Sequence, residues 1–131
     1  MGKKKMNIVG LSKEINKITQ TYLKDVNSTV NIVATEVAKA AQKELTQRSK
    51  DYGWKGYAKN WRIKDASTPG NVSKIIYNFK YGPLVHLLEK GHATRNGTSR
   101  TRAFPHVGPV EEKFTEIYEE RMIDALSNMT K

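Results

Sequence analysis

The sequence predicts an α+β fold: a long N-terminal helix, a small antiparallel hairpin, a short helix, a basic loop and a C-terminal helix. Three patterns predict it. Apolar residues recur at steps of three and four over residues 11–48, and they alternate with polar residues on both sides of a turn cluster at residues 67–71. Helical spacing returns after residue 108. In this order of elements, helices are expected to pack on one face of a small sheet.

The composition limits the range of functions. The chain has 131 residues, a formal net charge of +10 and no cysteine. We expect a flexible basic N-terminus at residues 1–10 and one domain over residues 11–131. The missing cysteines exclude disulfides, thiolate zinc sites and cysteine nucleophiles. No apolar run approaches the ~18 residues of a membrane span, so we expect no membrane contact and no signal peptide.

The charge is unevenly distributed along the chain. Residues 111–131 contain six acids and three bases, a net charge of −3, so residues 1–110 carry +13. This asymmetry indicates contact with a polyanion or an acidic protein surface. The acidic segment is equally suited to pair with the basic part of a neighbouring copy.

The first expected element is the helix over residues 11–48. Its apolar positions are Leu11, Ile15, Ile18, Tyr22, Val26, Val30, Val33, Val37, Ala41 and Leu45. A break near Asp25 to Ser28 is an alternative, since Asp, Asn and Ser compete for backbone hydrogen bonds. A strand around Val30 to Val33 is a lesser alternative. The stripe has two interpretations: packing in the core, which we prefer, and binding of a partner.

The hairpin is expected to follow, between residues 57 and 81. The apolar positions before the turn are Tyr57, Trp61 and Ile63, and those after it are Ile75, Tyr77, Phe79 and Tyr81. They alternate with a set that includes Lys74, Ile76, Asn78 and Lys80. The alternation predicts that the first set forms the buried face and that the other face is rich in lysine and asparagine.

A short helix, a loop and a last helix complete the expected fold. Pro83 suits the first turn of the short helix, and Gly91 is placed to end it as a C-cap. Leu84, Leu87 and Leu88 are expected to anchor this helix in the core. The loop over residues 92–108 has no acidic residue. Its basic residues are His92, Arg95, Arg100, Arg102 and His106.

The last helix is expected to begin at Gly108-Pro109. Glu111 and Glu112 are expected in its first turn, where they would favour the positive end of the helix dipole. Its apolar face contains Val110, Phe114, Ile117, Tyr118, Met122, Ala125, Leu126 and Met129.

The residues do not predict an enzyme. His86, His92 and His106 lack metal-ligand spacing, and the chain has no GxSxG, GxGxxG or P-loop motif. Glu89 near His92 resembles an acid–base pair, but nothing completes a site around it. We therefore expect no catalytic residue, cofactor, metal or small-molecule substrate.

The basic loop is the most informative polar feature. Its functional interpretation is contact with nucleic acid or with an acidic partner. The alternative is a solvated loop that happens to be basic, since Phe104 is the only aromatic residue there and no stacking platform interleaves the charges. Trp54 and Trp61 are expected to be core or rim residues.

Two runs of sequence resemble a known family. The run Leu87-Leu88-Glu89-Lys90-Gly91-His92 resembles the leucine-leucine-glutamate-x-glycine-histidine signature of the HK97 gp10-like phage tail-component family. Arg95-Asn96-Gly97 and then Phe104-Pro105-His106-Val107-Gly108-Pro109, leading into an acidic helix, resemble its second signature. Gly56-Tyr57-Ala58-Lys59-Asn60-Trp61 matches its pattern at the hairpin. The resemblance covers roughly residues 10–128. Thr98-Ser99 departs from it, where many relatives continue with another glycine.

The resemblance implies a non-enzymatic structural protein of a tailed bacteriophage or prophage, acting in tail completion or head–tail joining. Its implied partners are the connector or stopper, the tail terminator and the tail tube, within a homo-oligomeric ring that passing DNA can contact. It implies a location in the virion neck or tail, and in the host cytoplasm during assembly. We further expect Arg95, Arg100 and Arg102 to lie on a mobile loop that becomes ordered on assembly. The alternative function is a free basic nucleic-acid-binding protein, consistent with the sequence pI of about 9.8.

Overall fold

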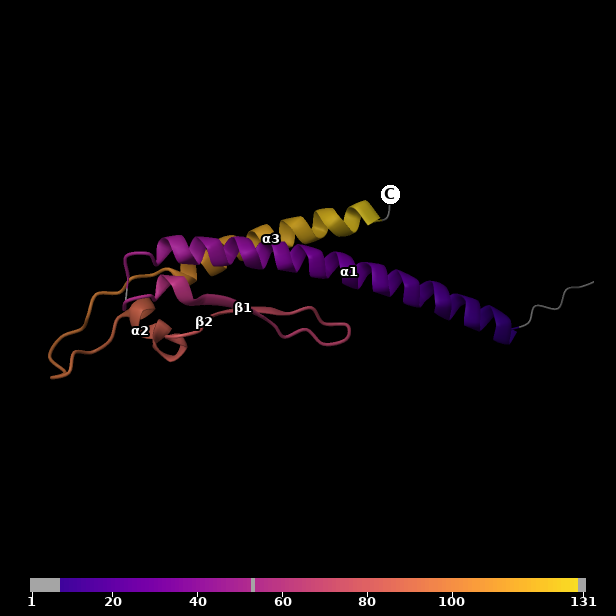
Figure 1. Ribbon diagram of the computed structural model, residues 1–131. Coiled ribbons are helices and arrows are strands. Elements are labelled where there is room, and N and C mark those ends of the chain that lie inside the picture. Colours follow the sequence, from indigo (N-terminus) through magenta and orange to yellow (C-terminus); the bar gives the residue numbers. More distant parts are fainter. Residues whose placement is uncertain (1–7, 53, 130–131) are drawn as a thin grey trace, which may run out of the picture.

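The computed structural model describes residues 8–52 and 54–129 and has the α+β architecture expected from the sequence (Figure 1). The regular elements follow in the expected order. They are α1 (Ile8–Arg48), the one-turn 3-10 helix η1 (Ala58–Asn60), β1 (Trp61–Asp65), β2 (Lys74–Asn78), the 3-10 helix η2 (Gly82–Leu84), α2 (Val85–Lys90) and α3 (Val107–Met129).

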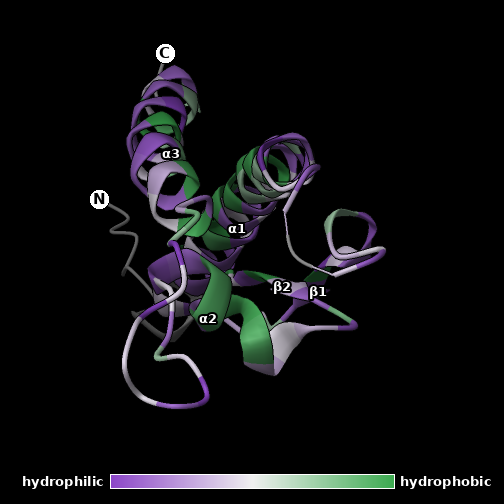
Figure 2. Ribbon diagram, turned by 90° about the vertical axis from the view of Figure 1, so that its left-hand side faces the viewer, coloured by the Kyte–Doolittle hydropathy of each residue, from purple (hydrophilic) through white to green (hydrophobic). Residues whose placement is uncertain are grey.

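The helix α1 is the axis of the molecule. The helix α3 runs antiparallel along one side of it, and the β1–β2 hairpin packs along another side (Figures 1 and 2). Two ion pairs join the helices: Lys113 with Glu44, and Arg121 with Glu36. Within the described residues, no helix combines the length and apolarity needed to cross a membrane.

α1 is continuous, so the break considered near Asp25 does not occur. Asp25, Asn27 and Ser28 are exposed, and their side chains point to solvent rather than competing within the helix. The helix also begins at Ile8, three residues before the expected start. The rest of the expected flexible N-terminus, residues 1–7, lies outside the described residues.

The core lies where the C-terminal half of α1 meets the base of the hairpin and the start of α3. It is formed by buried Ala41, Leu45, Tyr57, Trp61 and Val110. Partly buried residues pack around them: Ile76, Tyr81, Val85, Leu88, Val107 and Phe114. Trp61 is 4% exposed and Trp54 is 40% exposed, which confirms the expected core and rim positions.

The core interpretation of the α1 stripe is correct for only half of the helix. Val33, Val37, Ala41 and Leu45 are buried. By contrast, every residue from Ser12 to Asp25 is exposed. We call this segment, residues 12–25, the α1 arm. Figure 1 shows the N-terminal end of α1 extending past the C-terminal end of α3, where no other helix or strand of the described residues covers it.

The sequence predicted the wrong buried face for β2, because the buried positions are shifted by one residue along the strand. Trp61 lies opposite Asn78 and Ile63 lies opposite Ile76, and opposite residues in an antiparallel pair share a face. Asn78 is therefore buried, whereas Ile75, Tyr77 and Phe79 are 46%, 38% and 69% exposed. The buried amide is satisfied, because it donates to the Tyr57 carbonyl (2.8 Å) and accepts from the Tyr81 N–H (2.9 Å).

The short helix α2 is anchored by Leu88 and not by Leu84. Leu88 packs against the core cluster, whereas Leu84 is 37% exposed, so its expected anchoring role is incorrect. We expect Leu88→Ala to lower the free energy of unfolding by about 2 kcal/mol, and Leu84→Ala by less than about 1 kcal/mol. Denaturant unfolding of the two variants measures the difference, and equal losses would contradict this packing.

Candidate functional site

The basic loop leaves α2 at Gly91 and returns to α3 at His106. Gly91 is the C-cap of α2, as expected, with φ +71° and ψ 173°. A Cβ atom at this position would lie 2.5 Å from the Thr101 carbonyl oxygen, so the outgoing and returning segments pass backbone to backbone. The Phe104 N–H donates to the Leu88 carbonyl (2.8 Å), which ties the returning segment to α2.

The loop doubles back on itself like a short hairpin. Ala93 forms an antiparallel bridge with Arg100, and the Thr94 N–H donates to the Ser99 carbonyl (2.8 Å). At the tip, the Asn96 carboxamide oxygen accepts from the Thr98 hydroxyl (2.9 Å). Ordering of a mobile loop on assembly stays a prediction.

The arginines of the loop are exposed and differ in their surroundings. In the described part of the chain, none of Arg95, Arg100 and Arg102 forms an ion pair. Arg100 donates to the Gly91 carbonyl (3.2 Å) and so helps to close the loop. The Arg102 guanidinium lies 5.4 Å from the Phe104 ring centroid. Arg95 and Arg102 therefore keep their charge available to an external anion, and His92 at the start of the loop is also exposed.

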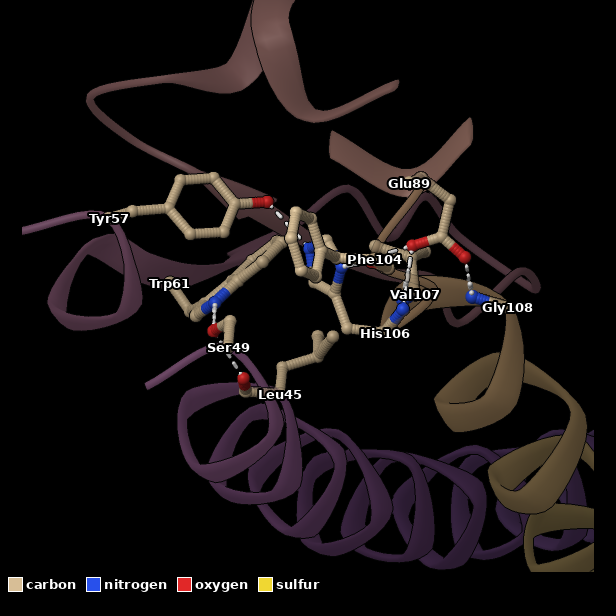
Figure 3. A network of polar contacts seen from close by, with 9 residues as sticks. All are labelled: Leu45, Ser49, Tyr57, Trp61, Glu89, Phe104, His106, Val107 and Gly108. Carbon is tan, nitrogen blue, oxygen red and sulfur yellow. Dashed lines mark hydrogen bonds and ion pairs between the residues drawn. The ribbon is translucent and has the colours of Figure 1, made fainter. Parts of the chain in front are cut away.

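Glu89 joins α2 to the start of α3 through an unexpected contact (Figure 3). Its Oε1 accepts from the N–H groups of His106 (2.8 Å) and Val107 (2.7 Å), and its Oε2 accepts from the Gly108 N–H (2.9 Å). These N–H groups have no partner within the helix, and they carry the positive end of its dipole. Glu89 thus takes the role expected of Glu111 and Glu112, which lie beyond the first turn because α3 begins at Val107.

The surroundings of Glu89 keep it ionised. Burial alone would raise the pKa of its carboxyl group. The three backbone N–H donors and the nearby His106 ring have the opposite effect, and the net result is a pKa below its usual value. The ionised carboxylate of Glu89 can accept hydrogen bonds from all three N–H groups.

His106 belongs to the core and not to the basic surface of the loop. Its ring is 0% exposed and Tyr57 is 1% exposed. The ring Nδ1 lies 2.7 Å from the Phe104 carbonyl oxygen and 3.2 Å from Glu89 Oε1, and both oxygens only accept. We therefore place the hydrogen on Nδ1, so that Nε2 accepts from the Tyr57 hydroxyl at 2.7 Å (Figure 3). Burial, followed by the charge of Glu89, raises the pKa of Tyr57, which keeps this hydroxyl protonated.

Tyr57, His106 and Glu89 resemble a catalytic relay in residue type but not in accessibility. Trp61 and Tyr57 pack edge-on against the His106 ring, at centroid distances of 6.0 and 5.6 Å. The Trp61 indole donates in turn to buried Ser49 (3.0 Å). Aromatic rings and backbone therefore enclose the histidine, and no substrate reaches it. We call this buried set of contacts among Tyr57, Trp61, Glu89 and His106 the loop anchor. Its geometry suits a structural role, in which it stabilises the base of the loop.

The structure brings together only some of the residues that carry the family resemblance. Leu88, Glu89, Gly91 and His106 converge at the base of the loop, where Pro109 lies in the first turn of α3. Leu87 is half-buried, whereas His92 and Pro105 are exposed. Glu89 pairs with His106 and not with neighbouring His92. The placement of His106 within the apolar run from Phe104 to Val107 was the signal that could have identified it as buried.

A second feature is an apolar groove beside the core. Its floor is α1, one wall is α3 and the other wall is the hairpin. It is lined mainly by apolar side chains, among them Ala34, Val37, Ala38, Phe114, Tyr118 and Ile76. Glu111 and Glu119 lie on the α3 wall. The described residues contain no group of three or more side chains placed to hold a metal ion.

Comparison of the chain with protein-family models, with curated proteins and with solved structures found no match.

Proposed function

We propose that this chain is a structural protein of the neck or upper tail of a tailed bacteriophage or prophage. It acts in tail completion or head–tail joining by binding other virion proteins, and it is not an enzyme. The observation that supports this most is the convergence of Leu88, Glu89, Gly91 and His106 on the loop anchor. These residues carry the family resemblance, and together they hold a cationic loop out from the body.

In this proposal the chain works through its outer surfaces. Arg95 and Arg102 contact acidic neighbours among the connector or stopper, tail terminator and tail tube, or the DNA that passes through the ring. The acidic helix α3 faces basic segments of adjacent copies. Assembly occurs in the host cytoplasm, and the protein then resides in the neck or tail of the virion. No cofactor, metal or small molecule takes part.

The test is a double charge reversal in the phage genome that encodes the chain. Arg95→Glu with Arg102→Glu is expected to weaken the contact at least about a hundredfold, because like charges at an interface cost several kcal/mol. Lysates should then contain separate filled heads and tails in electron micrographs. Arg100 is left unchanged, because its hydrogen bond to Gly91 closes the loop.

The matched control reverses two exposed lysines of α1, Lys39→Glu with Lys43→Glu, which changes the net charge equally. Both double variants should keep the melting temperature of the wild type. Normal infectious particles from the arginine variant would refute the proposed role of the loop, and equal defects in both variants would refute its specificity.

The second candidate, a free nucleic-acid-binding protein, is favoured by the unpaired loop arginines and the net charge of +10. A true binder loses affinity steeply with salt and keeps affinity near or below micromolar at physiological salt. Titration of duplex DNA at several salt concentrations separates the candidates. Tight binding together with normal particle assembly by the arginine variant would favour this second function.

A further inference from the structure

The α1 arm presents an apolar stripe that no described residue of its own chain covers. Ile15, Ile18 and Tyr22 are 53%, 64% and 54% exposed. Their spacing of i, i+3 and i+7 places them on one face of the helix, the pattern with which amphipathic helices bind apolar grooves. Isolated helices of this length are marginal in water, because most helical stability in proteins comes from packing of the apolar face. The arm therefore needs a partner surface.

The apolar groove is a surface of the required kind. It is open between α3 and the hairpin, with Val37 and Ala38 on its floor and Phe114 and Tyr118 on its α3 wall. Val37 and Ala38 are themselves only 6% and 7% exposed, so the apolar surface that the groove offers lies on its walls. There, Phe114, Tyr118 and Ile76 are half-buried. Every copy thus carries one exposed apolar helix face and one groove with apolar walls.

The arm cannot fold back into the groove of its own chain, because both belong to the same continuous helix. Thr115 lies on α3 between Lys113 and Arg121, which pair with Glu44 and Glu36 of α1, and this part of α1 is roughly 27–39 Å from Ile18 at ~1.5 Å per residue.

The solvent-exposed area of the chain is larger than that of a compact monomer of the same mass, as expected for a subunit that contacts neighbours. The whole chain exposes 9964 Å², whereas a compact monomer of 14.9 kDa exposes about 7000 Å². The ten residues outside the described ranges account for at most about 1600 Å² of the excess. Roughly 1400 Å² remains, which is close to two half-interfaces of about 800 Å² each. A subunit that contacts one neighbour through its arm and another through its groove would bury this much.

Charge favours a second copy of this chain as the occupant. The α1 arm contains three lysines and two acids, a net charge of +1. α3 contains six acids and two bases, a net charge of −4. Both bases are paired with α1 of their own chain, whereas none of the six acids forms an ion pair among the described residues. An arm beside α3 of a neighbour brings opposite net charges within a Debye length.

We propose that the α1 arm of one copy lies in the groove between α1, α3 and the hairpin of a second copy. Ile15, Ile18 and Tyr22 enter the groove and pack against its apolar walls. The contact joins two different surfaces, so repetition builds a closed ring or an open filament according to the rotation between neighbours. This inference deepens the proposed assembly role and rests on it for its biological setting, but the docking itself is testable on purified protein.

The chain has no cysteine, so directed cross-linking needs no background mutations. Full-length protein carrying Ile18→Cys and Thr115→Cys is treated with a short bis-maleimide reagent. Because the two positions are too far apart to be linked within one chain, we expect a ladder of dimers, trimers and higher species. Mixing the two single variants should give only arm-to-groove dimers.

The matched control replaces the groove cysteine by Ile123→Cys. Ile123 also lies on α3, is 67% exposed and does not line the groove, so this variant should give no ladder. Equal ladders from both variants would overturn the proposal. Dimers formed by Ile18→Cys alone, to the exclusion of arm-to-groove links, would show that arms pair with each other and would also overturn it.

Sedimentation velocity on unmodified protein supplies an independent measurement. Ile15→Gln, Ile18→Gln and Tyr22→Gln combined should weaken self-association at least about a hundredfold, since each removes an apolar contact without lowering helix propensity much. Ile123→Gln should associate like the wild type. Wild-type protein that stays monomeric and uncross-linked at all concentrations would refute the docking.

The two proposals fail in different ways. Unjoined heads and tails from the loop arginine variant, without arm-to-groove links, would retain the neck function and refute the docking. Arm-to-groove links together with normal particles from the loop arginine variant would retain the docking and refute the role of the loop in joining.

Discussion

Replacement of Glu89 by alanine is expected to lower the free energy of unfolding by about 3 kcal/mol or more. The change removes one charged acceptor and leaves the N–H groups of His106, Val107 and Gly108 without their partner. Hydrogen bonds to charged groups contribute about 1.5–3 kcal/mol each, and a buried donor left unpaired carries its full desolvation cost. Exposure of the Gly108 end of the contact to water limits the loss.

The same residue makes stability depend on pH in a defined direction. The pKa of Glu89 is lower in the folded chain than in the unfolded chain. Its contribution is therefore complete above the unfolded value, near 4.5, and is lost as the pH falls through the lower folded value. Glu89→Gln keeps the shape but removes the charge, so its unfolding free energy should fall less steeply than that of the wild type below pH 5.

Glu112→Ala is the control for position on the same helix. Glu112 is exposed and forms no ion pair in the described part of the chain, so its removal should change stability by less than about 0.5 kcal/mol. Denaturant unfolding at pH 7 and at acid pH measures all three variants. A loss for Glu112→Ala as large as that for Glu89→Ala would mean that general helix-dipole effects, and not the specific cap, stabilise α3.

The sequence predicted the structure correctly where the interactions that determine it are local along the chain. Helical spacing identified α1 and α3, the turn cluster identified the hairpin, and Gly91 marked the end of α2. These features depend on residues within a few positions of each other along the chain. The family resemblance also drew attention to Glu89 and His106, but it gave no contact between them.

The sequence-based predictions were wrong where a residue far away in the sequence determines burial or helix capping. Asn78 is buried because it lies opposite Trp61 and bonds the Tyr57 backbone, 21 residues away, so alternation alone placed β2 with the wrong face inward. Glu89 caps a helix that begins 18 residues later. The stripe of α1 has helical spacing along its whole length, but spacing does not reveal that α3 covers only its C-terminal half.

Gly91→Ala is expected to lower the free energy of unfolding as much as the loss of Glu89 does. Two separate features of the backbone at this position exclude a side chain. Its φ of +71° with ψ of 173° lies in a region that is essentially restricted to glycine, with a cost of about 1–3 kcal/mol for other residues. The added Cβ would also lie 2.5 Å from the Thr101 carbonyl oxygen. Relief of that clash displaces the returning segment of the loop, which carries Arg102 and leads to His106. We expect a total loss of about 3–5 kcal/mol.

Gly97→Ala separates backbone strain from the close approach. Gly97 also has a positive φ of +73°, but nothing lies within 4 Å of a Cβ built there. Its replacement should cost about 1–2 kcal/mol, the penalty of the left-handed conformation alone. The difference between the two variants in denaturant unfolding then measures how tightly the base of the loop is closed. Under the proposed function, in which the loop anchor holds the arginines in place, Gly91→Ala should also impair head–tail joining at temperatures where the variant remains folded, whereas Gly97→Ala should not. Equal losses of stability would mean that the loop base yields freely and that the anchor does not position the arginines.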